Sequence, residues 1–227
     1  MFYFPMGREE AFEPKVVKWL IIANGVMFII TLIYTPLFYL LALVPSYVLN
    51  GQRLWTLVTH MFLHAGFLHI FLNMYALFIF GPECEKEFGH LGFLILYFTS
   101  GLVGALLHIL LTPAKNTPAV GASGAIFGVM AAFAILYPRR RLGVFFFVGF
   151  IVLPAWALVV IFAIIETLYF IVGIPDFVAH MAHVGGMLGG ALFTFIYKRT
   201  RRRRRPVSEP IMIVYQAEEY YEDEYGY

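Results

Sequence analysis

The sequence GASGAIFGVMAAFAILYPRRR, residues 121–141, decides the fold. Residues 122–138 contain no charged side chain, and their number matches the roughly 17 to 25 apolar residues that a helix needs to cross a bilayer. An arginine triplet follows directly, and basic residues collect on the cytosolic side of membranes. Glycines at helical spacing also give the stretch a face on which a second helix can approach closely. They are Gly121, Gly124 and Gly128. The stretch therefore predicts a tightly packed transmembrane helix that ends at the cytosolic surface.

The composition of the whole chain agrees with a membrane protein of several helices. Of the 227 residues, 61% are hydrophobic and 13% are charged, whereas soluble domains carry about a quarter charged residues and under half apolar ones. This excludes a soluble globular enzyme. The formal net charge of +2 gives no indication of a nucleic acid partner. The single cysteine, Cys84, excludes a disulfide framework and a thiolate cluster for zinc or iron–sulfur.

Six apolar stretches of spanning length predict an all-α, polytopic membrane protein, built as a bundle of six transmembrane helices. The stretches lie near residues 17–35, 66–82, 90–112, 122–138, 152–172 and 177–197. We divide the chain accordingly into a cytosolic amino-terminal segment (1–16), a membrane domain (17–198) and a cytosolic tail (199–227) that is first basic and then acidic and tyrosine-rich. No cleavable signal peptide is expected over residues 1–12, because charged residues interrupt them and a short apolar core is missing.

The lysines and arginines predict which way the helices run. With six spans and a cytosolic amino terminus, 14 of the 16 basic residues fall on the cytosolic side, and Arg53 and Lys115 fall outside. An odd number of spans would place one of the two basic termini on the wrong face. We therefore expect a multi-pass protein of the cell membrane, with both termini in the cytosol.

The segment between the first two spans, residues 36–65, is expected to be a long loop on the outer side. It is apolar but is interrupted by prolines and an Asn-Gly pair, and its stretch 37–44 is too short to cross a membrane. We expect a short helix there, lying in the membrane interface with Trp55 as an aromatic anchor. The alternative is a first span that extends to Val44 with a kink at Pro36, because membrane helices tolerate proline.

Polar side chains inside hydrocarbon are costly, so each one is a candidate functional residue. Of the four serines, two fall in the outer loop and the tail, and Ser100 lies midway along the third span. The fourth, Ser123, opens the fourth span at its outer end. His69 and His183 fall in the first turns of the second and sixth spans, which also enter from outside. The topology thus brings one hydroxyl and two imidazoles, from three separate segments, to a similar depth.

Glycines indicate that the fourth and sixth spans touch. The sixth span carries Gly-xxx-Gly pairs at 185/189 and 186/190, and the fourth carries its own small-residue face. A serine and a histidine on two such helices can come within about 2.6 to 3.2 Å, as a nucleophile and its general base require. The alternative is that the glycines only pack the helices and that Ser123 bonds a carbonyl of its own helix.

Carboxylates are scarce on the outer side, so we expect a Ser–His dyad. Asp176 lies four residues before His180, a spacing that lets the two pair along a helix. Glu166 is the one carboxylate well inside an expected span, the fifth. Neither is an obvious third member of a triad, and the alternative is that one of them orients the base.

Three motifs together resemble those of the rhomboid family of intramembrane serine proteases. They are HAGFLHIFLN at residues 64–73, GASGAIFG at 121–128 and AHVGGMLG at 182–189, in the family's order on the second, fourth and sixth expected spans. The similarity covers roughly residues 15–198 and implies a six-helix bundle of rhomboid type. The chain departs from the family in one respect. Many rhomboids carry Trp-Arg in the outer loop, whereas Arg53 here precedes the tryptophan, which puts in doubt how the loop is braced.

The resemblance implies roles for four residues. Ser123 would be the nucleophile, and His183 rather than its competitor His180 would be the general base, because it precedes the Gly-Gly pair. His69 and Asn73, one helical turn apart, would stabilise the oxyanion together with the Ser123 backbone N–H. The fifth span would act as a movable wall near substrate entry.

Two other functions explain part of the pattern. Histidines could supply imidazole ligands to a metal or haem, although this leaves the glycine motif around Ser123 unexplained; the candidates are His60, His64, His69, His180 and His183. A non-catalytic rhomboid-like binding or transport protein is less consistent with the sequence, because both catalytic positions are filled, one by Ser123 and the other by His183. We therefore expect a serine endopeptidase without a cofactor, with its active site toward the outer side of the lipid bilayer. Its expected substrates are transmembrane segments with weakly helical residues, because a continuous helix encloses its own carbonyls.

Overall fold

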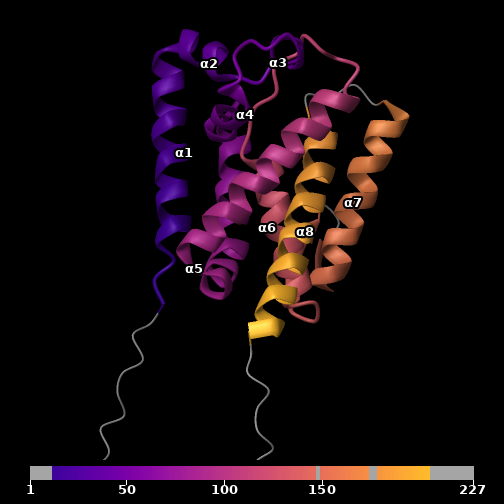
Figure 1. The fold of residues 1–227 in the computed structure, drawn as a ribbon. Helices are drawn as coiled ribbons and strands as arrows, with labels where there is room; N and C mark the ends of the chain where they lie inside the picture. Colours follow the sequence, from indigo (N-terminus) through magenta and orange to yellow (C-terminus); the bar gives the residue numbers. More distant parts are fainter. Residues whose placement is uncertain (1–11, 147–148, 174–177, 205–227) are drawn as a thin grey trace, which may run out of the picture.

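The computed structural model describes residues 12–146, 149–173 and 178–204, and most of them are helical (Figure 1). The elements in chain order are α1 (Lys15–Ile33), α2 (Thr35–Leu41), α3 (Pro45–Leu49), α4 (Thr56–Thr59), the 3₁₀ helix η1 (His60–Phe62), α5 (Phe67–Leu111), α6 (Ser123–Leu136), β1 (Arg141–Phe146), β2 (Gly149–Pro154), α7 (Ala155–Val172) and α8 (His180–Arg204).

The helices agree with a membrane protein. Among the described residues, three helices are long and apolar enough to cross a membrane, namely α1, α5 and α7. Two of the expected spans, 66–82 and 90–112, lie within α5, while the fourth and sixth correspond to α6 and α8. That the chain crosses the bilayer six times stays a prediction.

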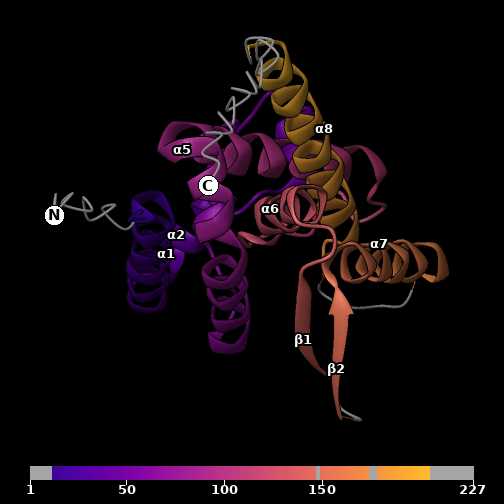
Figure 2. The ribbon, with the colours of Figure 1, turned by 90° about the horizontal axis from the view of Figure 1, so that it is seen from below.

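The 45-residue helical run of α5 is interrupted at Gly89. Gly89 has φ 74° and ψ 168°, in a left-handed region that glycine adopts readily and other residues do not. The two arms of α5 run in different directions from this point (Figure 2). The boundary expected between the second and third spans therefore coincides with this break.

The amino end of α1 is fixed to the same region by Glu85, a fully buried carboxylate of α5. The backbone N–H groups of Val16 and Val17 donate to its two oxygens, each at 2.8 Å. First-turn N–H groups have no partner within their own helix, and the helix dipole favours an anion at this end. His90, just beyond the break, also contacts the Glu85 carboxylate. One buried carboxylate thus joins α1 to both arms of α5.

The centre of the bundle is formed by α5, α6 and α8, which pack on one another (Figure 2). A Cβ built on Gly186 would overlap the carbonyl of Gly124, and one built on Gly190 would overlap the carbonyl of Gly128. Such an approach of two backbones requires glycine at these positions. The predicted contact between the small-residue faces of the fourth and sixth spans is confirmed.

The outer segment folds into short helices between α1 and α5. Helix α1 ends before Tyr34, which has the non-helical angles φ −122° and ψ 77°, and α2 then begins with Pro36 in its first turn. The expected short helix is therefore present, although it ends at Leu41 because Leu43 pairs with Ala119 in an isolated β-bridge. The alternative, a first span that extends to Val44 with a kink at Pro36, differs from the structure, in which the helix is interrupted at Tyr34 and α2 ends at Leu41.

Arg53 and Trp55 hold the outer segment together. The Arg53 guanidinium donates to the carbonyl of Tyr39 at 3.3 Å and lies 4.5 Å from the ring centroid of Tyr47. The Trp55 indole N–H donates to the carbonyl of Leu40 at 3.2 Å. The arginine therefore braces this segment from its displaced position.

The all-α prediction needs one correction, because residues 141–154 contain an antiparallel pair of strands. In β1 and β2, Arg141 pairs with Pro154 and Phe146 with Gly149. Figure 2 shows the hairpin extending away from the helices, beside α6 and α7. Residues 141–151 were expected to be a connection and residues 152–154 the start of the fifth span, which instead begins as helix at Ala155. The valine, isoleucine and phenylalanine residues of the hairpin are typical of strands.

Candidate active site

Ser123 is the first residue of α6, and the turn that leads into this helix depends on Gly121. Gly121 has φ 127°, which favours glycine, and its N–H donates to the carbonyl of His60 at 2.9 Å. This bond ties the turn to the outer segment. Because the first N–H groups of a helix have no partner inside it, the backbone at Ser123 presents donors beside the hydroxyl.

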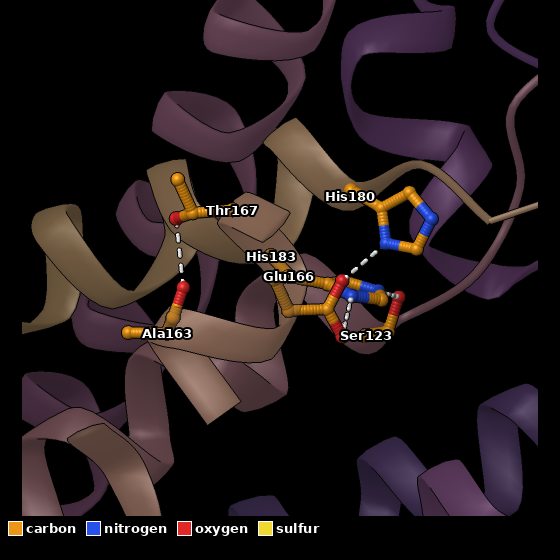
Figure 3. A network of polar contacts seen from close by, with 6 residues as sticks. All are labelled: Ser123, Ala163, Glu166, Thr167, His180 and His183. Carbon is orange, nitrogen blue, oxygen red and sulfur yellow. Dashed lines mark hydrogen bonds and ion pairs between the residues drawn. The ribbon is translucent and has the colours of Figure 1, made fainter. Parts of the chain in front are cut away.

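His183, in the first turn of α8, lies against Ser123. Its Nε2 is 2.7 Å from Ser123 Oγ (Figure 3). The imidazole is buried and stacks on the ring of Phe127, with ring centroids 4.4 Å apart and an interplanar angle of 22°. Phe127 follows Ser123 by one helical turn, so α6 both carries the hydroxyl and supports the imidazole. The structure therefore brings these two predicted residues together.

A third group, Glu166 of α7, lies on the other side of the imidazole. Its Oε1 is 3.0 Å from His183 Nδ1, and its Oε2 is 2.6 Å from His180 Nδ1 (Figure 3). The contact with His183 has the distance of an ion pair, but its angles are not those of an aligned hydrogen bond. Sequence reasoning had kept Glu166 only as an alternative to the isolated dyad.

The two histidines at the start of α8 differ in their surroundings. His180 contacts Glu166, and its ring centroid lies 5.3 Å from that of Tyr169. The pairing that the sequence suggested for His180, with Asp176, lies outside the described residues.

His69 lies in the first turn of α5 and faces the turn before Ser123. A Cβ built on Gly121 would lie 2.8 Å from His69 Nε2 and 3.6 Å from Ser123 Oγ, so both atoms border one point. The backbone N–H of Ala65 points at His69 Nδ1 at 3.5 Å. Because Nδ1 then acts as an acceptor, the neutral ring carries its proton on Nε2, on the side of Ser123.

Asn73 is buried one turn further along α5. Its amide Nδ2 donates to the carbonyl of His69 at 2.8 Å. An amide NH₂ group has two donors, so this bond leaves the second N–H for another acceptor. The structure thus places Asn73 on the helix face of His69, with part of its hydrogen-bonding capacity used by the helix itself.

The remaining histidines of the outer segment are buried and neutral. His60 Nδ1 lies 2.8 Å from the carbonyl of Thr56, and burial lowers the pKa of His60 to about 4 and that of His64 to about 3. Within residues 12–146, 149–173 and 178–204, no group of three or more His, Cys, Asp or Glu side chains is arranged to hold a metal.

One support of the site, Phe127, was missed by sequence reasoning. It stands in the glycine motif at 121–128 and was given no role, although its position four residues after Ser123 places it on the same helix face. Glu166 was named only as an alternative, because its approach to His183 depends on how α7 is rotated against α8.

These features define a helical membrane protein in which a serine and a histidine meet at the first turns of two closely packed helices. A family model described as "Rhomboid domain" matches residues 51–200 of the chain. The chain belongs to the rhomboid family, and its recognition from the three motifs is confirmed.

Curated relatives from bacteria and plants are similar to this chain. "Putative rhomboid protease YdcA" of Bacillus subtilis (strain 168) is 33% identical over 159 residues, which cover 69% of this chain and 73% of that protein. "RHOMBOID-like protein 6, mitochondrial" of Arabidopsis thaliana is 32% identical over 156 residues, or 66% of this chain and 45% of that protein. The chain therefore spans less than half the length of this plant relative.

Another relative bears on activity. "Inactive RHOMBOID-like protein 8" of Arabidopsis thaliana is 29% identical over 139 residues, which cover 61% of this chain and 37% of that protein. Because similar proteins carry both protease and inactive names, the activity of this chain has to be argued from its own residues.

Proposed function

We propose that this chain is an intramembrane serine endopeptidase that cleaves transmembrane segments of membrane proteins. Membership of the rhomboid family supports an intramembrane protease in general. The observation that carries the specific proposal is the 2.7 Å contact between Ser123 Oγ and His183 Nε2. A nucleophile and its general base need this distance.

Bond cleavage would begin at Ser123. Its Oγ attacks the carbonyl carbon of the scissile peptide bond, and the hydroxyl proton passes to His183 Nε2. The carbonyl oxygen of the substrate becomes an oxyanion in the resulting tetrahedral intermediate. Stacking on Phe127 restricts the imidazole to the orientation that faces Ser123, which lowers the entropic cost of reaching the reactive geometry.

The oxyanion would be stabilised by donors on two helices. His69 Nε2 and Ser123 Oγ both border the turn at Gly121, the Ser123 backbone N–H has no acceptor within its own helix, and Asn73 supplies its amide from one turn below His69. Each such donor typically contributes on the order of 100- to 1000-fold to the chemical step.

Cleavage would then be completed in two stages. His183 first gives its proton to the leaving amine, which breaks the C–N bond and leaves the substrate acyl group on Ser123 Oγ. A water molecule then attacks the ester carbon while His183 takes the water proton, and the bond between this carbon and Ser123 Oγ breaks as His183 returns a proton to Oγ, which releases the carboxyl-bearing product. No cofactor takes part in this sequence.

The location of the site would select the substrate. Ser123 and His183 lie in the first turns of helices that are expected to enter the bilayer from outside, so the cut would fall near the outer surface. A transmembrane helix must unwind there to expose a carbonyl, and segments with weakly helical residues would therefore be favoured.

The proposal is tested with the full chain in liposomes that contain a single-span substrate. Ser123→Ala and His183→Ala should each abolish cleavage, and the double variant should lose little more, because the pair acts as a unit. A fluorophosphonate probe should label Ser123. The matched control is Ser100→Ala, which removes another buried serine of the bundle and should keep both cleavage and labelling.

The same assay separates the other functions. Full cleavage by Ser123→Ala would contradict the serine mechanism. Inactivation by chelators, with strong effects of His60→Ala and His64→Ala, would favour a metal site. Wild-type protein that neither cleaves nor takes the probe would favour a non-catalytic family member.

A further inference from the structure

Glu166 is a carboxylate inside an otherwise apolar helix. It is the one charged residue of α7, yet its side chain is turned inward and only 11% of it is exposed. A carboxylate in the hydrocarbon layer is costly unless it is paired, and such residues usually serve a function. An apolar side chain at this position would pack α7 against its neighbours without the free-energy cost of burying a carboxylate.

Both oxygens of Glu166 contact the candidate site rather than α7 itself. Oε1 lies 3.0 Å from His183 Nδ1 and Oε2 lies 2.6 Å from His180 Nδ1. The two histidines are three residues apart on α8 and therefore share a helix face. One carboxylate bridges them, as Figure 3 shows.

We propose that Glu166 is a positioning residue that holds the proton of His183 on Nδ1, so that Ser123, His183 and Glu166 act as a Ser–His–Glu triad. The inference deepens the proposed function and rests on it, because it assigns the residue that orients the same base. It adds α7 to the two helices that carry the Ser–His pair.

The chemistry requires this arrangement of protons. His183 can accept the serine proton only if Nε2 carries none, and the neutral ring must then hold its proton on Nδ1. A carboxylate oxygen at 3.0 Å from Nδ1 favours that tautomer and stabilises the imidazolium that forms during attack.

His180 has a supporting part in the same network. By holding Oε2 at 2.6 Å, it limits rotation of the carboxylate and keeps Oε1 directed at His183. This explains why two histidines lie at the start of α8 although one base is sufficient. His180→Ala should therefore reduce cleavage less than a change of Glu166, and far less than His183→Ala.

The competing explanation is that Glu166 only fastens α7 to α8. A fastening residue would affect stability or substrate binding, whereas a positioning residue would affect the chemical step. The distinguishing readouts are kcat against KM and the rate of fluorophosphonate labelling, since the small probe reports on Ser123 without a transmembrane substrate.

The experiment compares Glu166→Gln, Glu166→Ala and Glu166→Asp with wild type in liposomes. Gln and Ala should lower kcat by roughly 10- to 1000-fold with KM within about threefold, and should slow labelling in parallel. Glu166→Asp keeps the negative charge, so its kcat should be at least about tenfold higher than that of Glu166→Gln or Glu166→Ala. The matched control is Thr167→Val at the neighbouring position, whose hydroxyl donates to Ala163 at 2.7 Å within α7; it should stay within about twofold.

Three results would overturn the triad. They are wild-type kcat and labelling in Glu166→Gln, a change confined to KM or to the thermal midpoint, and an equal loss in Thr167→Val. If Glu166→Ala does not fold, the comparison of Glu166→Gln and Glu166→Asp with wild type tests the triad. If none of the three variants folds, the role of Glu166 is structural and the triad is overturned. Full cleavage by Ser123→Ala is a separate outcome, since it would overturn the proposed function itself.

Discussion

The backbone of Gly186 in α8 lies against the carbonyl of Gly124 in α6, with no space for a methyl group between them. Gly124 directly follows Ser123, and Gly186 comes about one turn after His183. The contact that brings these helices together therefore also sets the distance between the hydroxyl and the imidazole. Helix packing and the proposed catalysis would therefore depend on the same pair of glycines.

Replacing Gly186 by alanine should damage both stability and activity. The added methyl group must push α8 away from α6, which typically costs about 1 to 3 kcal/mol in a packed core. A displacement on the order of 1 Å at the Ser123–His183 contact should lower kcat by about 100-fold. The measurements are the free energy of unfolding in mixed micelles and the rate of substrate cleavage in liposomes.

Gly25→Ala is the matched control for this change. Gly25 lies inside helix α1, and a Cβ built on it meets nothing within 4 Å. The substitution should be neutral or slightly stabilising, because alanine favours a helix over glycine. Wild-type stability and cleavage in Gly186→Ala would show that the two helices are not held by this contact.

Glu85→Ala should destabilise the fold without a direct effect on chemistry. It removes two charge-assisted hydrogen bonds to the amino end of α1 and leaves the N–H groups of Val16 and Val17 without their acceptor. Such bonds contribute about 1.5 to 3 kcal/mol each, so a loss of several kcal/mol is expected from denaturant titration.

The control for Glu85 is Glu83→Gln on the same helix. Glu83 forms an exposed pair with Arg140 at 3.9 Å, and exposed pairs contribute at most about 1 kcal/mol. Similar losses in both variants would mean that the buried cap is no stronger than a surface contact.

The comparison between sequence and structure shows which information lies in local patterns. Glycine spacing predicted the contact of α6 with α8, and placement at a common depth predicted that Ser123 would meet a histidine. Helix α7 is apolar around most of its circumference, so apart from Glu166 its sequence carries little signal for the face turned to α8. That contact is set by the packing of α7 against two other helices and was not predictable.

The hairpin was missed for a different reason, and the break in α5 was predicted only as the boundary between the second and third spans. A search for spans of about 20 apolar residues counts length, and both features depend on backbone angles rather than length. Gly89 stood between the two spans without being recognised as a left-handed position. Residues 141–151 were read as a connection, because their apolar run is shorter than a span, and residues 152–154 were assigned to the fifth span.

Acidification should weaken the outer segment through His64. The imidazole titrates near 6.5 in an unfolded chain, whereas burial lowers its pKa to about 3 in the fold. Between these values the unfolded chain binds a proton that the folded chain does not, so stability falls as the pH is lowered from about 6.5. At pH 5 the loss from this histidine should be on the order of 2 kcal/mol.

His64→Phe tests this linkage, because phenylalanine keeps an aromatic ring against His69 but does not titrate. The free energy of unfolding should fall less in the variant than in wild type between pH 7.5 and pH 5. Parallel losses in the two proteins would assign the acid sensitivity to other groups.

The proposed topology predicts which positions a membrane-impermeant thiol reagent can reach. In a Cys84→Ala background, Lys115→Cys should be labelled from outside intact cells, because the loop between α5 and α6 is expected on the outer face. A cysteine placed at Tyr227 should be labelled only after the membrane is permeabilised. Labelling of the carboxyl terminus in intact cells would overturn the six-span topology.

Replacing the two proposed oxyanion donors should slow the chemical step. His69→Ala and Asn73→Ala should each lower kcat by roughly 10- to 1000-fold, and the double variant should lose less than the product of the two if both groups bind one oxygen. Asn24→Ala is a matched control, since Asn24 also donates to the carbonyl four residues before it at 2.8 Å but lies in α1. It should lower the thermal midpoint and leave kcat within about twofold. Cleavage by Asn73→Ala at the rate of Asn24→Ala would mean that the Asn73 amide only bonds its own helix, and the oxyanion would then depend on His69 and the Ser123 backbone.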